Sequence, residues 1–356
     1  MTRRLAPLGV GHAAASEAPR RQRRFRPTQL IPVGFGLAAI VALIVASDPS
    51  ALGHDIARFN LILVPAIFAC SASYYVLQGL RWYFLLREIG ARISPGDSIL
   101  LNIAGQSTSM LPLGELTRAV FVSEACADVE FGEVVATVTV QELIFMLILI
   151  LIAVPGVLSV HRALPGLIVA LLGITAVMAV LMVPSLFHLV HHVVERTPVL
   201  RRFTGQVDRL RQETVVLLHR PGTLGWSVLS VAGAGTGVTL LWLVVFGLNG
   251  RGLSWPMASF VLAAAYVAGA VSLIPGGIGA TELGVVGLLV VAGIDPATAT
   301  AAALLQRVGD KGFATAMGFI AYAIARHRFR LTGLTALRPR SPAGPPAPAT
   351  MEAVRA

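Results

Sequence analysis

Long uninterrupted apolar runs constrain this chain more than any other feature. Six runs approach or exceed the roughly 20 residues that an α-helix needs to cross the hydrocarbon core of a bilayer. A helix also satisfies its own backbone hydrogen-bonding groups, which lipid cannot do. We therefore predict an all-α, polytopic helical membrane protein with six full spans, at about 28–47, 61–80, 134–154, 165–187, 224–247 and 298–325.

The composition supports this prediction. Of the 356 residues, 55% are hydrophobic and only 13% are charged, whereas a soluble domain carries roughly 25% charged residues. A soluble all-α protein with buried helices is the alternative, but it would not require so many unbroken apolar runs. Lipid in place of water around much of the surface explains the deficit of charge.

The positive charge of the chain does not indicate nucleic acid. The net charge of +10 comes from arginines at the two ends and in one central segment, without a basic face that carries interleaved aromatic residues. The two cysteines, Cys70 and Cys126, form no CxxC motif, so neither a disulfide framework nor a metal site is predicted. No phosphate-binding loop, dinucleotide fingerprint or nucleophile motif is present. We therefore expect neither a cofactor nor an enzymatic activity.

The distribution of arginine predicts the topology, because cytoplasmic loops of membrane proteins are enriched in Lys and Arg. This rule places both termini, a loop at 81–97 and the central segment in the cytoplasm of a bacterial inner membrane. We predict a disordered basic N-terminus, a membrane domain that contains an amphipathic cytoplasmic linker, and a disordered tail. Their bounds are 1–27, 28–325 with the linker at 188–222, and 326–356.

Two further apolar segments are broken by proline and glycine. Residues 98–117 contain Pro112 and Gly114, and residues 256–294 contain Pro275, Gly276 and Gly277. The predicted topology makes the first segment begin and end on the cytoplasmic side and the second on the outer side. Each is therefore predicted to be a re-entrant hairpin, although a pair of short spans satisfies the same parity.

The two broken segments resemble each other. Each begins with serine and proline, turns at proline and glycine, and continues to a glutamate, Glu115 or Glu282. Similar units inserted from opposite faces form an inverted-topology repeat, here with halves at about 61–187 and 224–325. Paired interrupted segments of this kind indicate the midplane site of a transporter. Chance similarity of short apolar stretches, or kinked helices that only pack, are the alternatives.

Polar and charged residues within the apolar segments are the candidate site. A charge at the bilayer centre costs at least ~2.5–3.5 kcal/mol on insertion scales, so its presence indicates function. Glu142 and Arg307 occupy matching repeat positions, and either pair with each other or contact a substrate. The predicted lipid-binding residues are Asn102, Gln106, Pro112, Gly114, Glu115, Arg118, Glu142, Pro275, Gly276, Gly277, Glu282, Gln306, Arg307, Asp310 and Lys311.

The motifs at the two turns resemble a known family. Pro112-Leu-Gly114-Glu115-Leu-Thr-Arg118, Pro275-Gly-Gly-Ile-Gly279-Ala-Thr-Glu282 and Gln306-Arg307 are similar to the lysylphosphatidylglycerol synthase transmembrane region, a flippase-like family. The resemblance covers about residues 30–325. It implies a membrane domain that moves aminoacylated phospholipid between leaflets, beside a soluble domain that makes this lipid in fused members. We expect a stand-alone member without that soluble domain, since only some 30 residues follow the last predicted span.

The leading functional hypothesis is a flippase or translocase that moves a phospholipid or a polyprenyl-linked lipid between leaflets. Its expected partners are membrane lipids and not nucleic acid. The alternatives are a membrane-embedded transferase, or an accessory scaffold for a separately encoded enzyme that modifies lipids or isoprenoids.

Overall fold

The computed structural model describes residues 38, 40–45, 49–109, 114–126, 128–158, 179–180, 183–187, 211–212, 214–248, 252–272 and 274–331. Every regular element in these ranges is helical, which confirms the predicted all-α class. The predicted N-terminus at 1–27 and most of the predicted linker at 188–222 lie outside the described residues, as do most of the spans at 28–47 and 165–187. Of the predicted tail at 326–356, residues 326–329 are helical and residues 332–356 lie outside the described residues.

Three of the described helices are long and apolar enough to cross a membrane. They contain α3 (Val64–Glu88, after a 3₁₀ turn at Leu61–Leu63), α6 (Phe131–Leu158) and α11 (Val228–Gly247, after α10, Pro221–Trp226). These helices cover the predicted spans at 61–80, 134–154 and 224–247. They identify the chain as a helical membrane protein.

The prediction that a loop begins at residue 81 is wrong. Helix α3 continues to Glu88, and α4 (Pro95–Gly105) begins after a short turn. The sequence 81–88 contains no proline or glycine, and Trp82, Leu85 and Leu86 continue the buried face of the helix. Arg81 therefore lies within a helix and not in a loop, and it is buried.

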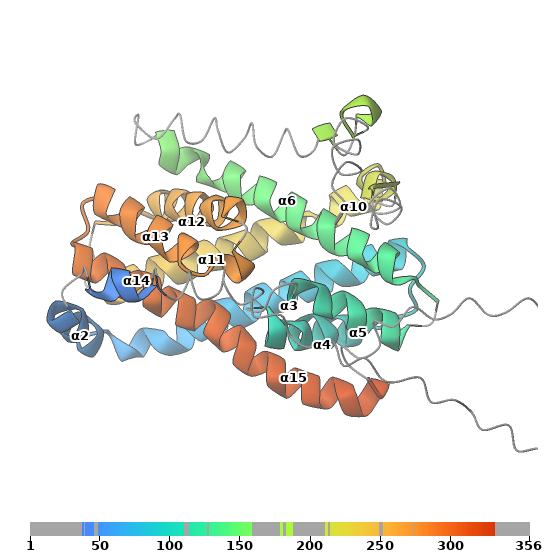
Figure 1. Cartoon of the computed structure of the whole chain (residues 1–356), viewed down its shortest axis with the longest axis horizontal. Coiled ribbons are helices and arrows are strands. Elements are labelled where there is room, and N and C mark those ends of the chain that lie inside the picture. The colour runs from blue at the N-terminus through green and yellow to red at the C-terminus, as the bar shows by residue number, and fades with distance from the viewer. Residues whose placement is uncertain are drawn as a thin grey trace, which may run out of the picture.

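Two helical hairpins lie at opposite ends of the molecule, with α3, α6 and α11 running between them (Figure 1). One consists of α4 and α5 (Thr117–Ala125), and the other of α12 (Trp255–Val271) and α13 (Ala280–Val291). The first hairpin is longer than the predicted segment 98–117, because Ser94 caps α4 and α5 continues to Ala125.

The Pro/Gly turn of the second hairpin is described, whereas the turn of the first is described only in part. In the second, a 3₁₀ turn at Pro275–Gly277 separates the helices, as predicted, and Gly276 and Gly277 have φ of 64° and 62°. These angles favour glycine because a Cβ would clash with the backbone. In the first, 3₁₀ turns are described at Gln106–Thr108 and Gly114–Leu116, on either side of the gap at 110–113. Pro112 lies outside the described residues.

The predicted span at 298–325 is a single helical stretch with a widened turn inside it. Helix α14 (Pro296–Arg307) passes through a π-helical turn, Val308–Gly312, into α15 (Phe313–Phe329). Asp310 and Lys311 lie in this turn, and the stretch is not among the three apolar spans. A π-turn inside an α-helix is frequently found at a functional site.

Close helix contacts depend on individual glycines. A Cβ on Gly156 of α6 would lie 1.9 Å from the carbonyl oxygen of Pro256 at the start of α12. A Cβ on Gly318 of α15 would lie 2.4 Å from the backbone nitrogen of Ser107, where the first hairpin begins to turn. Neither neighbour is the end of a flexible side chain, so the backbones themselves would have to separate.

We predict that Gly318→Ala destabilises the protein by about 1–3 kcal/mol, the usual cost of overpacking a close contact. Gly287→Ala in α13 is the matched control, because no atom lies within 4 Å of its added Cβ and alanine favours a helix. Thermal unfolding of both purified variants in detergent measures the difference. Equal melting temperatures would show that α15 does not need this approach to the first hairpin.

Candidate functional site

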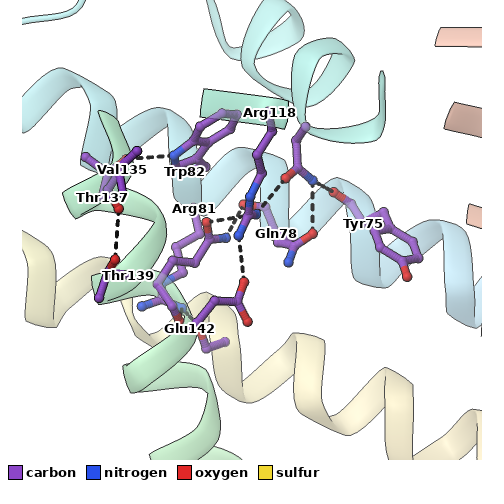
Figure 2. Close-up of polar contacts among 12 residues, drawn as sticks. Tyr75, Gln78, Arg81, Trp82, Arg118, Val135, Thr137, Thr139 and Glu142 are labelled. Atoms are coloured by element: carbon purple, nitrogen blue, oxygen red, sulfur yellow. Dashed lines mark hydrogen bonds and ion pairs between the residues drawn. The ribbon is translucent and has the colours of Figure 1, made fainter. Parts of the chain in front are cut away.

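The most buried charge in the first hairpin is that of Arg118, near the start of α5. Its side chain is fully buried, and its Nη2 lies 2.7 Å from Oε1 of Glu142 on α6 (Figure 2). Nη1 donates to Oδ1 of Asn102 at 3.1 Å and to Oε1 of Gln141 at 3.4 Å. The guanidinium also lies over the ring of Trp82, 5.5 Å from its centroid. Arg118 therefore joins the hairpin to both α3 and α6.

The partners of Arg118 are held in turn by α3. Asn102 donates through Nδ2 to the carbonyl of Tyr75 and to Oε1 of Gln78, both at 3.1 Å. Gln141 donates through Nε2 to the carbonyl of Gln78 at 2.9 Å. Figure 2 shows Gln78, Arg118 and Glu142 converging between α3 and α6. The geometry of Arg118 is thus fixed by a connected polar network.

The second hairpin carries a second buried ion pair, between Glu282 and Arg307. Oε1 of Glu282 lies 3.1 Å from Nη1 of Arg307, and the carboxylate is 2% exposed. Its other oxygen accepts the backbone N–H of Gly279 at 2.7 Å and so caps α13. Nη2 of Arg307 donates to the carbonyl of Gly276 at 2.8 Å. Arg307 therefore holds the Pro/Gly turn against α14.

Of the two alternatives for Glu142 and Arg307, the one in which they pair with each other is wrong. Each pairs with the charged residue of its own hairpin: Glu142 with Arg118, and Arg307 with Glu282. The two pairs have opposite polarity, since the hairpin supplies the arginine in one and the glutamate in the other. Their hairpins lie at opposite ends of the molecule (Figure 1), which is why matching sequence positions do not meet.

Asp310 of the π-turn is held by two tyrosines. Its Oδ1 accepts from the hydroxyl of Tyr75 at 2.9 Å, and its Oδ2 accepts from the hydroxyl of Tyr266 on α12 at 3.0 Å. Nζ of the neighbouring Lys311 lies 5.9 Å from the centroid of the Tyr75 ring. A carboxylate in an apolar bundle thus obtains its hydrogen bonds from α3 and α12.

Two adjoining clefts lie between α3, α6, α11 and α12. The first is lined by Tyr74, Leu77, Gln78, Arg81, Gln141, Glu142, Phe145, Leu229, Ser230 and Gly233. The second is lined by Cys70, Ser71, Tyr74, Phe145, Ala234, Gly237, Leu240, Leu262, Tyr266, Gln306 and Asp310. Tyr74 and Phe145 line both, so the clefts meet at these two rings.

The predicted site residues do not form one cluster. Asn102, Arg118 and Glu142 belong to the network of the first hairpin. Gly276, Glu282 and Arg307 belong to the turn of the second. Pro275 and Gly277 lie in that same turn, and Pro112 lies outside the described residues.

Asp310 and Lys311 lie in the π-turn, and Gln306 lies just before it. Gln106, in the first hairpin, is buried and lies beside Gly318 of α15. Gln306 and Asp310 line the second cleft. Gly114 and Glu115 start the turn into α5. A Cβ on Gly114 would lie 1.6 Å from the carbonyl oxygen of Thr108, so this turn requires glycine.

A polar stripe on α3, which consists of Ser71, Tyr74, Gln78 and Arg81, was not predicted from the sequence. All four line the clefts. Their spacing of three or four residues is that of one helix face, and this periodicity in an otherwise apolar run was the available signal. Ser230 and Tyr266 were also missed, and nothing in their local sequence distinguishes them.

The sequence pattern of the Lysylphosphatidylglycerol synthase TM region family matches residues 30–337. The chain belongs to this family. The family is a membrane domain linked to lipid-related functions, and the match confirms the resemblance found in the two turn motifs. No curated protein matches the chain. In this family member, the last charged residue of each motif, Arg118 or Glu282, is the one that forms the buried ion pair of its hairpin.

We predict that substitutions of Arg118 and Glu142 have strongly non-additive effects on the free energy of unfolding. Arg118 is fully buried, so Glu142→Ala leaves a desolvated charge without its counter-charge. The double variant Arg118→Met/Glu142→Ala removes that charge. A double-mutant cycle should give a coupling free energy of about 1–3 kcal/mol. Chemical unfolding in mixed micelles measures it.

The matched control for this cycle is the pair Arg328–Asp97, which has a similar N–O distance of 2.9 Å but a mostly exposed arginine. Its coupling should stay within about 0.5 kcal/mol, as for other exposed pairs. Equal coupling in both pairs would contradict a special structural role for Arg118.

Proposed function

We propose that this protein is an integral membrane lipid translocase of the flippase type, which moves a phospholipid or polyprenyl-linked lipid between leaflets. The observation that carries the proposal is the polar stripe on α3. It follows two adjoining clefts through a bundle of otherwise apolar spans. From Ser71 to Arg81 the stripe rises about 15 Å at 1.5 Å per residue, which is half of the ~30 Å hydrocarbon core.

A polar path of this kind meets the main physical demand of lipid translocation. The headgroup must pass through a region where an unsatisfied polar group costs several kcal/mol, whereas the hydrocarbon tail is already in its preferred solvent. Hydroxyl, amide and charged groups along one face of a span supply replacement hydrogen bonds for the headgroup. The tail remains among apolar side chains or in lipid.

The two hairpins support a refined architecture for the translocase. We infer that they are re-entrant and enter from opposite faces as an inverted-topology repeat, with both chain termini in the cytoplasm of a bacterial inner membrane. The support is their position at opposite ends of the molecule (Figure 1) and the buried ion pair that each contributes. Inverted repeats of this kind place a substrate site between the halves.

The roles of the charged residues follow from their partners. We assign Arg118, Arg307 and Glu282 to holding the hairpins, because each already has an opposite charge within 3.1 Å. We assign headgroup contact to cleft residues, including Glu142, whose side chain is 41% exposed, Gln306 and Asp310. No bond is made or broken in this mechanism, so the proposal assigns no enzymatic activity to the chain, and its partners are membrane lipids.

We predict that the purified protein accelerates the exchange of fluorescent lipid between the leaflets of liposomes. Dithionite quenching of labelled phosphatidylglycerol, aminoacyl-phosphatidylglycerol and polyprenyl phosphate measures the exchange. Gln78→Leu should slow it at least tenfold, because the change removes the middle of the polar stripe. That factor corresponds to about 1.4 kcal/mol of lost stabilisation along the path.

The control variant is Val76→Leu, two residues away on the exposed side of the same helix. It should leave exchange unchanged. If folded wild-type protein moves no labelled lipid faster than protein-free vesicles do, the translocase proposal fails. That result would favour an accessory scaffold or a membrane-embedded transferase instead.

A further inference from the structure

Arg81 is a buried arginine that belongs to neither of the two ion pairs described above. It lies on α3, seven residues before the helix ends at Glu88, and it is 2% exposed. It lines the first cleft together with Gln78, Glu142 and Ser230. Figure 2 shows it beside Glu142, below the network of Arg118.

Only one of the guanidinium nitrogens of Arg81 has a partner among the described residues. Nη1 donates to the carbonyl of Gln141 at 3.1 Å and to the hydroxyl of Ser230. Nε and Nη2 are buried and have no hydrogen-bond partner in the described part of the chain. These two nitrogens form one edge of the planar guanidinium, with parallel N–H groups that match two oxygens of a phosphate or carboxylate.

The charges around the cleft are also unbalanced. Arg81 and Arg118 both bond to Gln141, through its carbonyl and its side-chain oxygen. Glu142 is the one carboxylate among the described residues that line this cleft, and it already pairs with Arg118 at 2.7 Å. Two buried cations thus share one anion, and a buried charge without compensation is strongly unfavourable.

We propose that Arg81 is the anion-binding residue of the first cleft and that its free edge binds the phosphate group of a lipid. This inference rests on the proposed translocase function, because it assigns a headgroup class to the same path. The guanidinium edge would donate one hydrogen bond to each of two phosphate oxygens, and a third oxygen would lie near the amide of Gln78. The bound anion would restore the charge balance that Glu142 cannot supply to both arginines.

The walls of the cleft favour a lipid phosphate over a free one. Beside the polar residues, the cleft is lined by Leu77, Phe145, Leu229 and Gly233. An added Cβ on Gly233 would first meet the Tyr74 ring, at 3.7 Å, which is ordinary contact. Phosphate binding by Arg81 and acyl contact along α11 thus fit one amphipathic ligand.

The test is lipid binding by the full chain in a phosphate-free maltoside detergent. Native mass spectrometry would compare phosphatidic acid with diacylglycerol of the same acyl chains, which lacks the phosphate. Wild-type protein should retain phosphatidic acid at least tenfold more tightly. Arg81→Gln should weaken its binding by about tenfold or more, the effect of losing two charge-assisted hydrogen bonds.

The matched control is Arg87→Gln, an exposed arginine six residues further along the same helix. It should bind phosphatidic acid within twofold of wild type. A global charge effect on an acidic lipid would lower both variants equally, and that result would overturn the proposal.

A second pair of variants tests the cleft without touching the charge. Gly233→Leu fills the cleft and should also lose phosphatidic acid. Gly235→Leu, on the same helix with open space at its added Cβ, should retain it. The unliganded Arg81→Gln protein should melt at or above the wild-type temperature, since it loses an uncompensated buried charge. A large fall in its melting temperature would assign Arg81 a structural role instead.

Two further comparisons distinguish a lipid phosphate from free phosphate, and distinguish failure of the Arg81 site from failure of the translocase function. Inorganic phosphate that competes with phosphatidic acid at equal concentration would show a free-anion site and overturn the lipid assignment. The translocase function alone would fail if the wild-type protein exchanged no lipid in liposomes. Loss of phosphatidic acid binding in Arg81→Gln would still support the site in that case. Unchanged binding and unchanged exchange in Arg81→Gln would overturn the site alone.

Discussion

The burial of charge among apolar helices is the constraint on which the rest of this structure depends. Arg118 is completely removed from solvent, and only its ion pair with Glu142, its amide partners and the Trp82 ring make that burial tolerable. These partners come from α3, α4 and α6. To satisfy one guanidinium, the chain must therefore bring three helices to fixed positions, and two of them, α3 and α6, line the first cleft.

The second hairpin meets a related requirement, which concerns backbone groups. A Pro/Gly turn leaves N–H and carbonyl groups without helical partners, and lipid offers none. Glu282 accepts the N–H of Gly279, Arg307 donates to the carbonyl of Gly276, and the two side chains neutralise each other. A turn and a helix N-terminus are thus stabilised by one ion pair, and α14 is fixed against the hairpin.

The chemistry of the clefts depends on the polar groups that the two ion-pair networks do not fully engage. Arg118, Arg307 and Glu282 each have an opposite charge within 3.1 Å, whereas one edge of the Arg81 guanidinium has no partner among the described residues and Glu142 remains partly exposed. Asp310 is bound by tyrosine hydroxyls and not by a cation. The path along α3 therefore presents an unpaired cation at one end and a carboxylate at the other. Such a path suits a polar headgroup better than an apolar ligand.

The sequence by itself determined the helical membrane class, three of the spans, the turn at Pro275 and the family, because these depend on local composition and on short contiguous motifs. It also named Arg118, Glu142, Glu282 and Arg307, since a charge in an apolar run is conspicuous. It could not assign their partners, and it misplaced Arg81 in a loop. Pairing depends on which helices pack together, and the end of a helix depends on whether its next turn finds a buried face. Both are properties of the tertiary structure, which alone decided which charges are satisfied and which one faces the cleft.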